Sequence, residues 1–253
     1  MRSPVLYLPM HVLPDATFAR ASRFFASIDF SRPVRHAVDI TEFSASFDGH
    51  AFSARVLTPR GDAQGAATAG PRPVVVWTHG GGHLIGGPAM YDPQNARMAA
   101  ELGAIVVAPR YHKSTQEPFP ADHDECYAAL RWVQEHGDKL GGDTSRIAVA
   151  GDSAGGGLAA EKLDVPWIEL SPHPLYSPSK GLPPIGSGMA PGTGIGGRLR
   201  DTLLRAAAGR SVRQGREQRS RARVGIGLPA VDPGPAARLI ATVPALEVPR
   251  PDW

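Results

Sequence analysis

The stretch RIAVAGDSAGGG at residues 146–157 constrains the fold of this chain more than any other. A short apolar run leads directly into a serine that has a glycine two positions away on either side. In the pattern G-x-S-x-G, the serine lies on a sharp turn between a strand and a helix, and its hydroxyl points away from the sheet. The glycines are needed because the two ends of such a turn approach each other closely. The stretch therefore predicts a strand, a tight turn that carries Ser153, and a helix.

A second glycine-rich motif lies earlier in the chain. The apolar run Val-Val-Val-Trp at 74–77 ends in Thr78 and is followed by His-Gly-Gly-Gly at 79–82. Consecutive glycines let backbone N–H groups face a developing oxyanion, because no Cβ fills the space that the oxyanion needs. An HGGG loop of this kind precedes the nucleophilic serine in many hydrolases. The two motifs together predict acyl-transfer chemistry at Ser153.

With these two motifs, HGGG at 79–82 and GDSAGGG at 151–157, the chain resembles the hormone-sensitive-lipase family of α/β-hydrolase esterases. The resemblance implies an α/β-hydrolase fold, with a mostly parallel sheet and helices on both faces. It implies a serine carboxylic-ester hydrolase that acts on small to medium acyl esters. In that reaction Ser153 attacks the carbonyl, and the backbone N–H groups of Gly81, Gly82 and Ala154 form the oxyanion hole.

The resemblance also assigns expectations to neighbouring residues. His79 is expected to brace the HGGG loop, and His83 to line the pocket. The segment RYHKSTQEPFPA at 110–121 matches a family motif at Tyr111 and at 118–121. The charged positions of that motif are changed, and their occupants here are Arg110, His112 and Gln116.

The remaining pattern predicts α/β order along the first part of the chain. Alternating residues at 40–47, a turn signal at Asp48-Gly49 and a strand at 51–57 predict an antiparallel hairpin. Further predictions are a surface loop at 59–73, a helix at 95–102, a buried strand at 104–108, a helix at 122–136 with one apolar stripe (Cys126, Ala129, Leu130, Val133), and a turn at 143–146. Residues 1 to about 36 are expected to form a short helix and loops, which either cap the acyl pocket, as the resemblance implies, or pack on the core for stability alone.

The acid and the base that would complete a catalytic triad with Ser153 are not evident in the sequence. In α/β-hydrolases an acid and then a histidine follow the serine along the chain. After Ser153 the sequence has one histidine, His173. The acids between them, Glu161, Asp164 and Glu169, are too close to Ser153 in sequence to be expected on later strands of the same sheet. Gly-Leu-Pro-Pro at 181–184 resembles the segment that introduces the family's acid, but no acid follows it directly. The triad acid and base are therefore left unidentified.

Composition changes in the last third of the chain. Residues 181–253 hold eleven arginines, no lysine and one aromatic residue, Trp253, and their net charge is +6, while residues 1–180 carry −3. A segment so poor in large apolar residues is expected to have low order. We therefore divide the chain into 1–163, a cap segment with the N-terminal half of the hydrolase domain, and 164–253, a divergent Arg/Gly/Pro-rich part. From the resemblance we expect this C-terminal part to be truncated, internally deleted or frameshifted relative to the family.

Three functions follow from these observations. The first is an esterase with impaired turnover, and the second is an inactive hydrolase remnant or ligand-binding protein. The third is nucleic-acid binding through the basic stretch 211–223, although no aromatic platform accompanies it and nucleic acid is not the expected partner. We expect a small-molecule ester as ligand, and no membrane, metal or cofactor; the sequence does not indicate the oligomeric state. The single cysteine, Cys126, fits a reducing compartment. Prolines interrupt the apolar runs near the N-terminus, so a signal peptide is not expected, and we predict a cytoplasmic location.

Overall fold

The computed structural model describes residues 33–61, 70–156, 168–171, 192–231 and 236–240, together with residues 16, 17, 19, 20, 23 and 24, which are helical. The chain divides into two units, Met1–Asp164 and Val165–Trp253. Most of the expected N-terminal cap lies outside the described residues. His173 and the Gly-Leu-Pro-Pro segment also lie outside them.

The first unit opens with the predicted hairpin. Strand β1 (Val38–Phe47) pairs antiparallel with β2 (His50–Pro59), and Phe47 lies opposite His50. The two residues between the strands, Asp48 and Gly49, have φ angles of 48° and 79°. Two positive φ angles in a two-residue loop match the twist of the flanking strands, and Asp-Gly is a sequence that adopts them. The hairpin prediction is confirmed.

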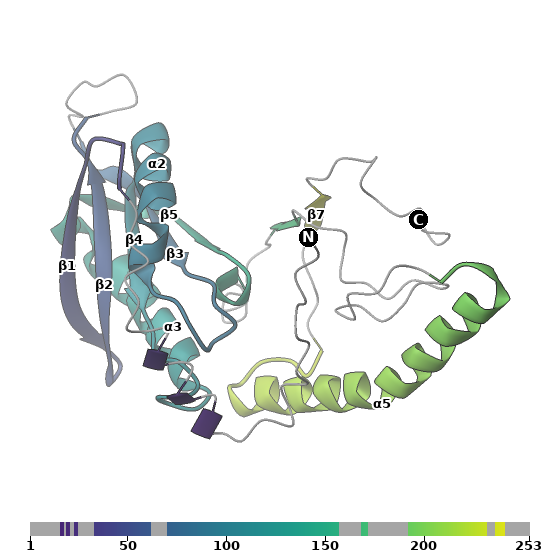
Figure 1. Cartoon of the computed structure of the whole chain (residues 1–253). Helices are drawn as coiled ribbons and strands as arrows, with labels where there is room; N and C mark the ends of the chain where they lie inside the picture. Colours follow the sequence, from purple (N-terminus) through teal and green to yellow (C-terminus); the bar gives the residue numbers. More distant parts are fainter. Residues whose placement is uncertain are drawn as a thin grey trace. The chain divides into compact units, whose positions relative to one another are not determined.

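The sheet of the first unit has the strand order β1-β2-β4-β3-β5 (Figure 1). Strand β2 is antiparallel to β4 (Ile105–Arg110), whereas β3 (Arg72–Thr78) is parallel to both β4 and β5 (Gly142–Gly151). The four described pairings are therefore evenly divided between antiparallel and parallel. Because β3 and β5 run side by side in the same direction, the two motifs that follow them emerge at one edge of the sheet.

Strand β5 begins earlier than the sequence predicts. A turn was expected at 143–146, but the strand starts at Gly142, and the pairing register with β3 shifts between Arg72 and Val74. Asp143 explains the irregularity, because its carboxylate accepts hydrogen bonds from the backbone N–H and the hydroxyl of Ser145 and from Arg146 Nε. The turn signal is real, but it produces a local distortion within the strand.

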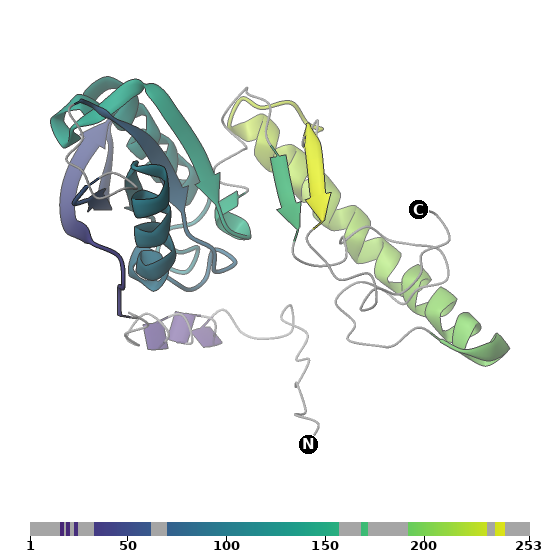
Figure 2. The same ribbon diagram turned by 90° about the horizontal axis from the view of Figure 1, so that it is seen from above.

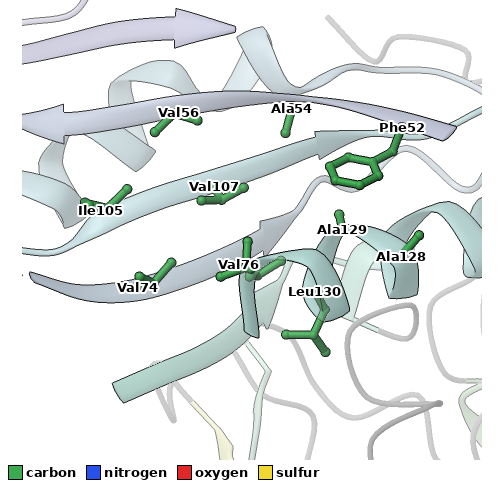
Figure 3. Packing of buried hydrophobic residues seen from close by; sticks show 11 residues of the cluster. Phe52, Ala54, Val56, Val74, Val76, Ile105, Val107, Ala128, Ala129 and Leu130 are labelled. Atoms are coloured by element: carbon green, nitrogen blue, oxygen red, sulfur yellow. The ribbon is translucent and has the colours of Figure 1, made fainter. Parts of the chain in front are cut away.

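Helices cover both faces of the sheet, as predicted. Helix α3 (Ala121–His136) packs on one face and α2 (Asp92–Leu102) on the other. Successive strand residues alternate between the two faces, so Val74 and Val76 lie towards α3 while Val75 lies towards α2. Figure 3 shows the α3 side, where Ala128, Ala129 and Leu130 of the helix meet buried side chains from three strands: Phe52, Ala54, Val56, Val74, Val76, Ile105 and Val107.

The apolar stripe predicted on α3 is buried along its whole length (Cys126, Ala129, Leu130, Val133). Short 3₁₀ helices adjoin the two main helices: η2 (Pro88–Tyr91) precedes α2, and η3 (Gly137–Leu140) follows α3. Helix α2 ends at Leu102, and Gly103, which follows it, has a φ of 61° and caps the helix in the left-handed conformation that favours glycine. These elements position the core on which both motif loops stand.

The second unit contains a feature that the sequence did not predict. Residues Gly194–Gly225 form one long helix, α5, inside the segment that was expected to have low order. Arginine is the most common residue of this stretch and, like its alanines, leucines and glutamines, has high helix propensity, but the stretch also contains six glycines, which have low propensity. Strands β6 (Ile168–Ser171) and β7 (Ala237–Ile240) pair in parallel, and Figure 2 shows them side by side. None of the described helices is long and apolar enough to cross a membrane.

Candidate active site

Ser153 lies on the predicted turn between a strand and a helix. Strand β5 ends at Gly151, and residues 154–156 are helical. Ser153 is exposed and has a φ of 53°. A non-glycine residue rarely adopts a positive φ, and such strain is frequent where a side chain must be held in a particular direction at a functional site. The nucleophile-elbow geometry expected from G-x-S-x-G is present.

The glycines of this motif have no room for a side chain. A Cβ placed on Gly151 would lie 2.5 Å from the carbonyl oxygen of Gly155. A Cβ on Gly155 would lie 2.2 Å from the carbonyl oxygen of Thr78 and 2.5 Å from that of His79. The atoms that obstruct Gly155 are backbone atoms, which cannot rotate away, whereas the atom closest to a Cβ on Gly151 is the side-chain oxygen Thr78 Oγ1, at 2.4 Å. The second glycine is therefore required because the turn packs against the start of the HGGG loop.

Hydrogen bonds join the two motifs directly. Thr78 Oγ1 donates to the carbonyl oxygen of Gly155 at 2.6 Å, and the backbone N–H of Asp152 donates to the carbonyl oxygen of Thr78 at 3.2 Å. The hydroxyl of Tyr91 donates to Asp152 Oδ2 at 2.9 Å, which holds the residue beside the serine from another side. The structure thus brings together two loops that lie far apart in the sequence.

The HGGG loop turns back on itself directly after the histidine. Gly81 and Gly82 have φ angles of 132° and 60°. The backbone N–H groups of Leu84 and Ile85 both donate to the carbonyl oxygen of Gly81 at 3.1 Å. A Cβ on Gly81 would lie 2.0 Å from the Ile85 carbonyl oxygen, whereas a Cβ on Gly82 would meet no atom within 4 Å. The space beside Gly82 is open. Ala154 begins the helix after the serine, and the oxyanion-hole role of its N–H and of the Gly81 and Gly82 N–H groups stays a prediction.

His79 is fully buried, and both of its ring nitrogens have partners. Nδ1 lies 2.7 Å from the carbonyl oxygen of Gly80, so Nδ1 carries the proton, and Nε2 lies 3.1 Å from Lys113 Nζ. The ring stacks on Tyr111 with 4.2 Å between centroids. Burial, and then the charge of Lys113, lower the pKa of His79 to about 3. A neutral imidazole with both nitrogens engaged supports the loop and is not available as a base for Ser153.

Tyr111 and Lys113 support the loop from the neighbouring segment. The Tyr111 hydroxyl donates to the carbonyl oxygen of His79 at 2.7 Å. Lys113 Nζ donates to the carbonyl oxygen of Tyr111 at 2.8 Å and lies 3.9 Å from the centroid of its ring. Lys113 is 7 % exposed, and burial lowers its pKa to about 8. Tyr111 was predicted from the sequence as a matched motif position, whereas the contribution of Lys113 was not predicted.

The changed positions of the 110–121 motif have partners of their own. His112 bonds to the carboxylate of Glu125 through its ring Nδ1, and its backbone N–H donates to Glu125 Oε2 at 2.7 Å. Gln116 Oε1 accepts from the backbone N–H of Lys113 at 2.9 Å. Arg110 Nη2 lies 3.7 Å from Glu42 Oε1. The altered charges therefore form a different set of contacts in this chain.

His83, the residue after the HGGG loop, pairs with an acid that the sequence analysis did not single out. Its Nδ1 lies 2.6 Å from Asp122 Oδ2, and Asp122 Oδ1 accepts from the backbone N–H of His123 at 2.9 Å. The carboxylate comes from the first turn of α3. A sequence signal existed, because Asp122 directly follows the matched run 118–121, but only the fold brings it to His83.

Other candidate ligands and bases are accounted for by packing. His123 is buried beside Asp122, with its ring edge-on to Phe119 at 5.0 Å, and His136 packs edge-on against Trp132. Within the described ranges, no group of three or more His, Cys, Asp or Glu side chains could hold a metal ion.

The comparison with known proteins agrees with this geometry. Residues 75–164 match the protein family described as alpha/beta hydrolase fold. Carboxylesterase NlhH of Mycobacterium tuberculosis is 52% identical over 88 residues, which cover 35% of this chain and 28% of the relative. Ethyl acetate hydrolase of Pseudomonas putida is 30% identical over 194 residues, which cover 73% of this chain and 59% of the relative. Hormone-sensitive lipase of Mus musculus is 39% identical over 87 residues, or 34% of this chain and 12% of the relative.

The chain is also similar to a solved structure of an ester hydrolase. The structure of an ester hydrolase from the Lake Arreo metagenome superposes with a TM-score of 0.51 at 25% identity, and the match covers 66% of this chain and 56% of the other. The chain thus spans less than two thirds of each of these relatives. The shared part contains both glycine motifs and the strands that carry them. Over residues 75–164 the chain matches the alpha/beta hydrolase fold family, and carboxylesterases and hormone-sensitive lipase are among the proteins to which it is similar.

Proposed function

We propose that this chain is a serine carboxylic-ester hydrolase that acts on small to medium acyl esters. In this proposal Ser153 attacks the ester carbonyl, and the backbone N–H groups of Gly81, Gly82 and Ala154 hold the oxyanion of the tetrahedral intermediate. Water then releases the acyl group. The names of the relatives, a carboxylesterase and an ethyl acetate hydrolase, support this reaction class.

One observation carries the proposal. The turn of Ser153 packs so closely on the start of the HGGG loop that Gly155 has no space for a methyl group beside the carbonyl oxygens of Thr78 and His79. Donors that are fixed before the substrate arrives stabilise the developing negative charge without reorganisation, and loss of one such donor costs about 10²- to 10³-fold in rate. A Cβ on Gly82 would meet no atom within 4 Å, and we expect the ester to approach the loop on this open side.

We expect turnover to be low, because the acid and base that follow the serine in α/β-hydrolases are not evident in this sequence. A serine hydroxyl is a weak nucleophile unless an adjacent base takes its proton. If turnover is absent, the alternative is a ligand-binding hydrolase remnant, and thermal stabilisation by an ester without its hydrolysis would favour it. We also propose a cytoplasmic location, which the single, buried cysteine Cys126 supports.

Hydrolysis of p-nitrophenyl acetate and butyrate by the purified chain and by its Ser153→Ala variant tests the proposal. We expect slow release of p-nitrophenol that saturates with substrate and disappears in the variant. Equal rates for the two proteins would show that the release does not depend on Ser153. Nucleic-acid binding through α5 is a separate hypothesis, and a salt-dependent mobility shift with duplex DNA would reveal it.

A further inference from the structure

We propose that Lys113 strengthens the Gly81 oxyanion donor through a hydrogen-bonded chain that runs from its ammonium group, across the His79 imidazole, to the Gly80–Gly81 peptide. The inference rests on the proposed ester hydrolysis, in which the Gly81 N–H holds the oxyanion. It gives Lys113 a role beyond support of the loop, as a positioning residue that acts on the reaction through His79.

The direction of each hydrogen bond in this chain follows from the chemistry of its members. An ammonium group has three donors and no acceptor, so Lys113 Nζ donates to His79 Nε2 at 3.1 Å. A neutral imidazole that accepts at Nε2 carries its proton on Nδ1, and Nδ1 therefore donates to the carbonyl oxygen of Gly80 at 2.7 Å. The imidazole is neutral because burial, and then the charge of Lys113, lower its pKa to about 3. Both bonds thus polarise in one direction, from the ammonium group to the carbonyl.

The last link of the chain is a peptide bond. The carbonyl of Gly80 and the N–H of Gly81 belong to one planar unit, in which resonance couples the oxygen to the nitrogen. A donor at the carbonyl oxygen draws electron density from the nitrogen, and its N–H becomes a stronger donor in turn. Hydrogen bonds in a chain strengthen one another in this way. The Gly81 N–H therefore binds an oxyanion more tightly while Lys113 is charged.

The ammonium group is held from three sides. Besides His79 Nε2, Lys113 Nζ contacts the carbonyl oxygen of Tyr111 at 2.8 Å and lies 3.9 Å from the centroid of the Tyr111 ring. The same tyrosine fixes the imidazole, because its ring stacks on His79 at 4.2 Å and its hydroxyl donates to the His79 carbonyl oxygen at 2.7 Å. Lys113 and His79 are both buried, and a charge polarises its neighbours more strongly in such surroundings than in water.

The polarised peptide belongs to the contact between the two motifs. A Cβ on Gly80 would lie 2.8 Å from the carbonyl oxygen of Asp152, the residue before Ser153. A Cβ on Gly155 would lie 2.5 Å from the carbonyl oxygen of His79. The charge of Lys113 is thus conveyed to a part of the loop that packs on the serine turn. No proton leaves its donor along the chain, which changes only the strength of the last donor.

The charge of Lys113 should also set an alkaline limit to turnover. Burial lowers the pKa of Lys113 to about 8, and the uncharged amine polarises His79 less than the ammonium group does. Burial raises the pKa of Cys126 and of Tyr111, so neither of these groups loses its proton near pH 8. The titratable and charged groups that face Lys113 come from its own segment, from the HGGG loop and from α3: Arg110, Tyr111, His79, Asp122, Glu125 and Cys126.

Steady-state hydrolysis of p-nitrophenyl butyrate by the full chain, measured across the pH range around the pKa of Lys113, tests the inference. Lys113→Met should lower kcat by about 10-fold with little change in KM, because the stronger hydrogen bond acts as charge develops on the oxyanion. This loss is smaller than the roughly 10²- to 10³-fold that accompanies removal of a whole donor. Lys139→Met, at an exposed position, is the matched control and should behave like the unmodified chain.

The pH profile separates the charge of Lys113 from its contribution to packing. In the unmodified chain kcat should fall as the pH rises through about 8, and Lys113→Met should lack this fall. Lys113→Arg keeps a charge that does not titrate in this range, so it should retain more turnover than Lys113→Met and also lack the fall. Circular dichroism and thermal unfolding identify any variant that loses its fold.

NMR of glycine-labelled protein provides a readout that does not require turnover. The Gly81 amide proton should move to higher field in Lys113→Met, because its peptide is less polarised, whereas the Gly103 amide proton at the end of α2 should not move.

The outcomes separate this inference from the proposed function. Turnover that depends on Ser153 but is the same in Lys113→Met, with the alkaline fall retained, overturns the role of Lys113 and leaves the esterase proposal intact. A change in KM alone also overturns it, since Lys113 would then act on ester binding. Absence of Ser153-dependent turnover in the unmodified chain overturns the esterase proposal, and the Gly81 resonance then decides the hydrogen-bonded chain by itself: no shift in Lys113→Met overturns it.

Discussion

Thr78 and Gly155 are joined by a 2.6 Å hydrogen bond from the threonine hydroxyl to the glycine carbonyl oxygen. The same hydroxyl lies 3.2 Å from the carbonyl oxygen of Ala150. The last residue of β3 is thus bonded to both sides of the turn that carries Ser153. This contact connects the strand before the HGGG loop to the strand before Ser153.

We predict that Thr78→Val destabilises the chain by about 1–3 kcal/mol, because it keeps the shape of the side chain but leaves buried carbonyl oxygens without a donor. Esterase turnover should fall as well, since the serine turn loses a constraint. Thr41→Val, at an exposed position of β1, is the matched control and should change stability by less than about 0.5 kcal/mol. Urea unfolding measures both. Equal stabilities of the two variants would show that the Thr78 bonds contribute nothing.

Gly155→Ala adds only one methyl group, but it should disrupt the site severely. The added methyl carbon would lie 2.2 Å from the carbonyl oxygen of Thr78, so the serine turn must move away from the HGGG loop. We expect loss of Ser153-dependent turnover and a lower melting temperature. Gly70→Ala, where a Cβ meets no atom within 4 Å, is the control and should behave like the unmodified chain. Retention of full turnover by Gly155→Ala would contradict the close packing of the two motifs.

Two arginines should differ sharply in their contribution to stability. Arg55 of β2 makes two hydrogen bonds, at 3.0 and 2.6 Å, to Asp92 of α2, whose side chain is 7% exposed. Arg55→Met would leave that buried carboxylate unpaired and should cost about 3–5 kcal/mol. Arg60→Met breaks the Arg60–Asp39 pair, in which both side chains are 62% exposed, and should cost at most about 1 kcal/mol. Denaturant unfolding of both variants checks the difference, and similar costs would contradict it.

Lys113 should make the free energy of unfolding depend on pH in the alkaline range. Burial lowers its pKa from the ordinary 10.5 to about 8, so between these values the unfolded chain binds more protons than the folded chain. The free energy of unfolding therefore rises with pH over this window, by up to about 3 kcal/mol, and the gain is absent below about pH 8.

Unfolding by urea at pH values of about 8 and 10 measures this slope. Lys113→Met removes the titrating group and should flatten the dependence, whereas Lys139→Met, at an exposed position, is the matched control. An unchanged slope in Lys113→Met would show that another group is responsible.

The sequence predicted those parts of the fold that local pattern determines. Asp48-Gly49 identified the hairpin because only certain residues adopt two consecutive positive φ angles. The continuous apolar runs of β3 and β4 identified buried strands, and the spacing from Cys126 to Val133 identified the apolar face of α3. The nucleophile turn was predicted for the same reason, since its glycines are required by local crowding.

Contacts that depend on tertiary structure were not predicted. Asp122 and His83 lie 39 residues apart, and nothing local indicates that a carboxylate on the first turn of α3 meets the imidazole after the HGGG loop. Lys113 was missed because a lysine is expected at the surface, whereas here the face of Tyr111 and the neutral His79 make burial tolerable. Helix α5 was missed because a low apolar content was given more weight than helix propensity.

A crystal structure of the chain after reaction with a p-nitrophenyl alkylphosphonate would show whether Ser153 and the three backbone N–H groups form one site. The phosphonate mimics the tetrahedral intermediate, so we expect phosphorus bonded to Ser153 Oγ and a phosphoryl oxygen about 2.7–3.1 Å from the backbone nitrogens of Gly81, Gly82 and Ala154. A phosphonate attached elsewhere, or attached to Ser153 with its oxygen turned away from these nitrogens, would show that these groups do not act together.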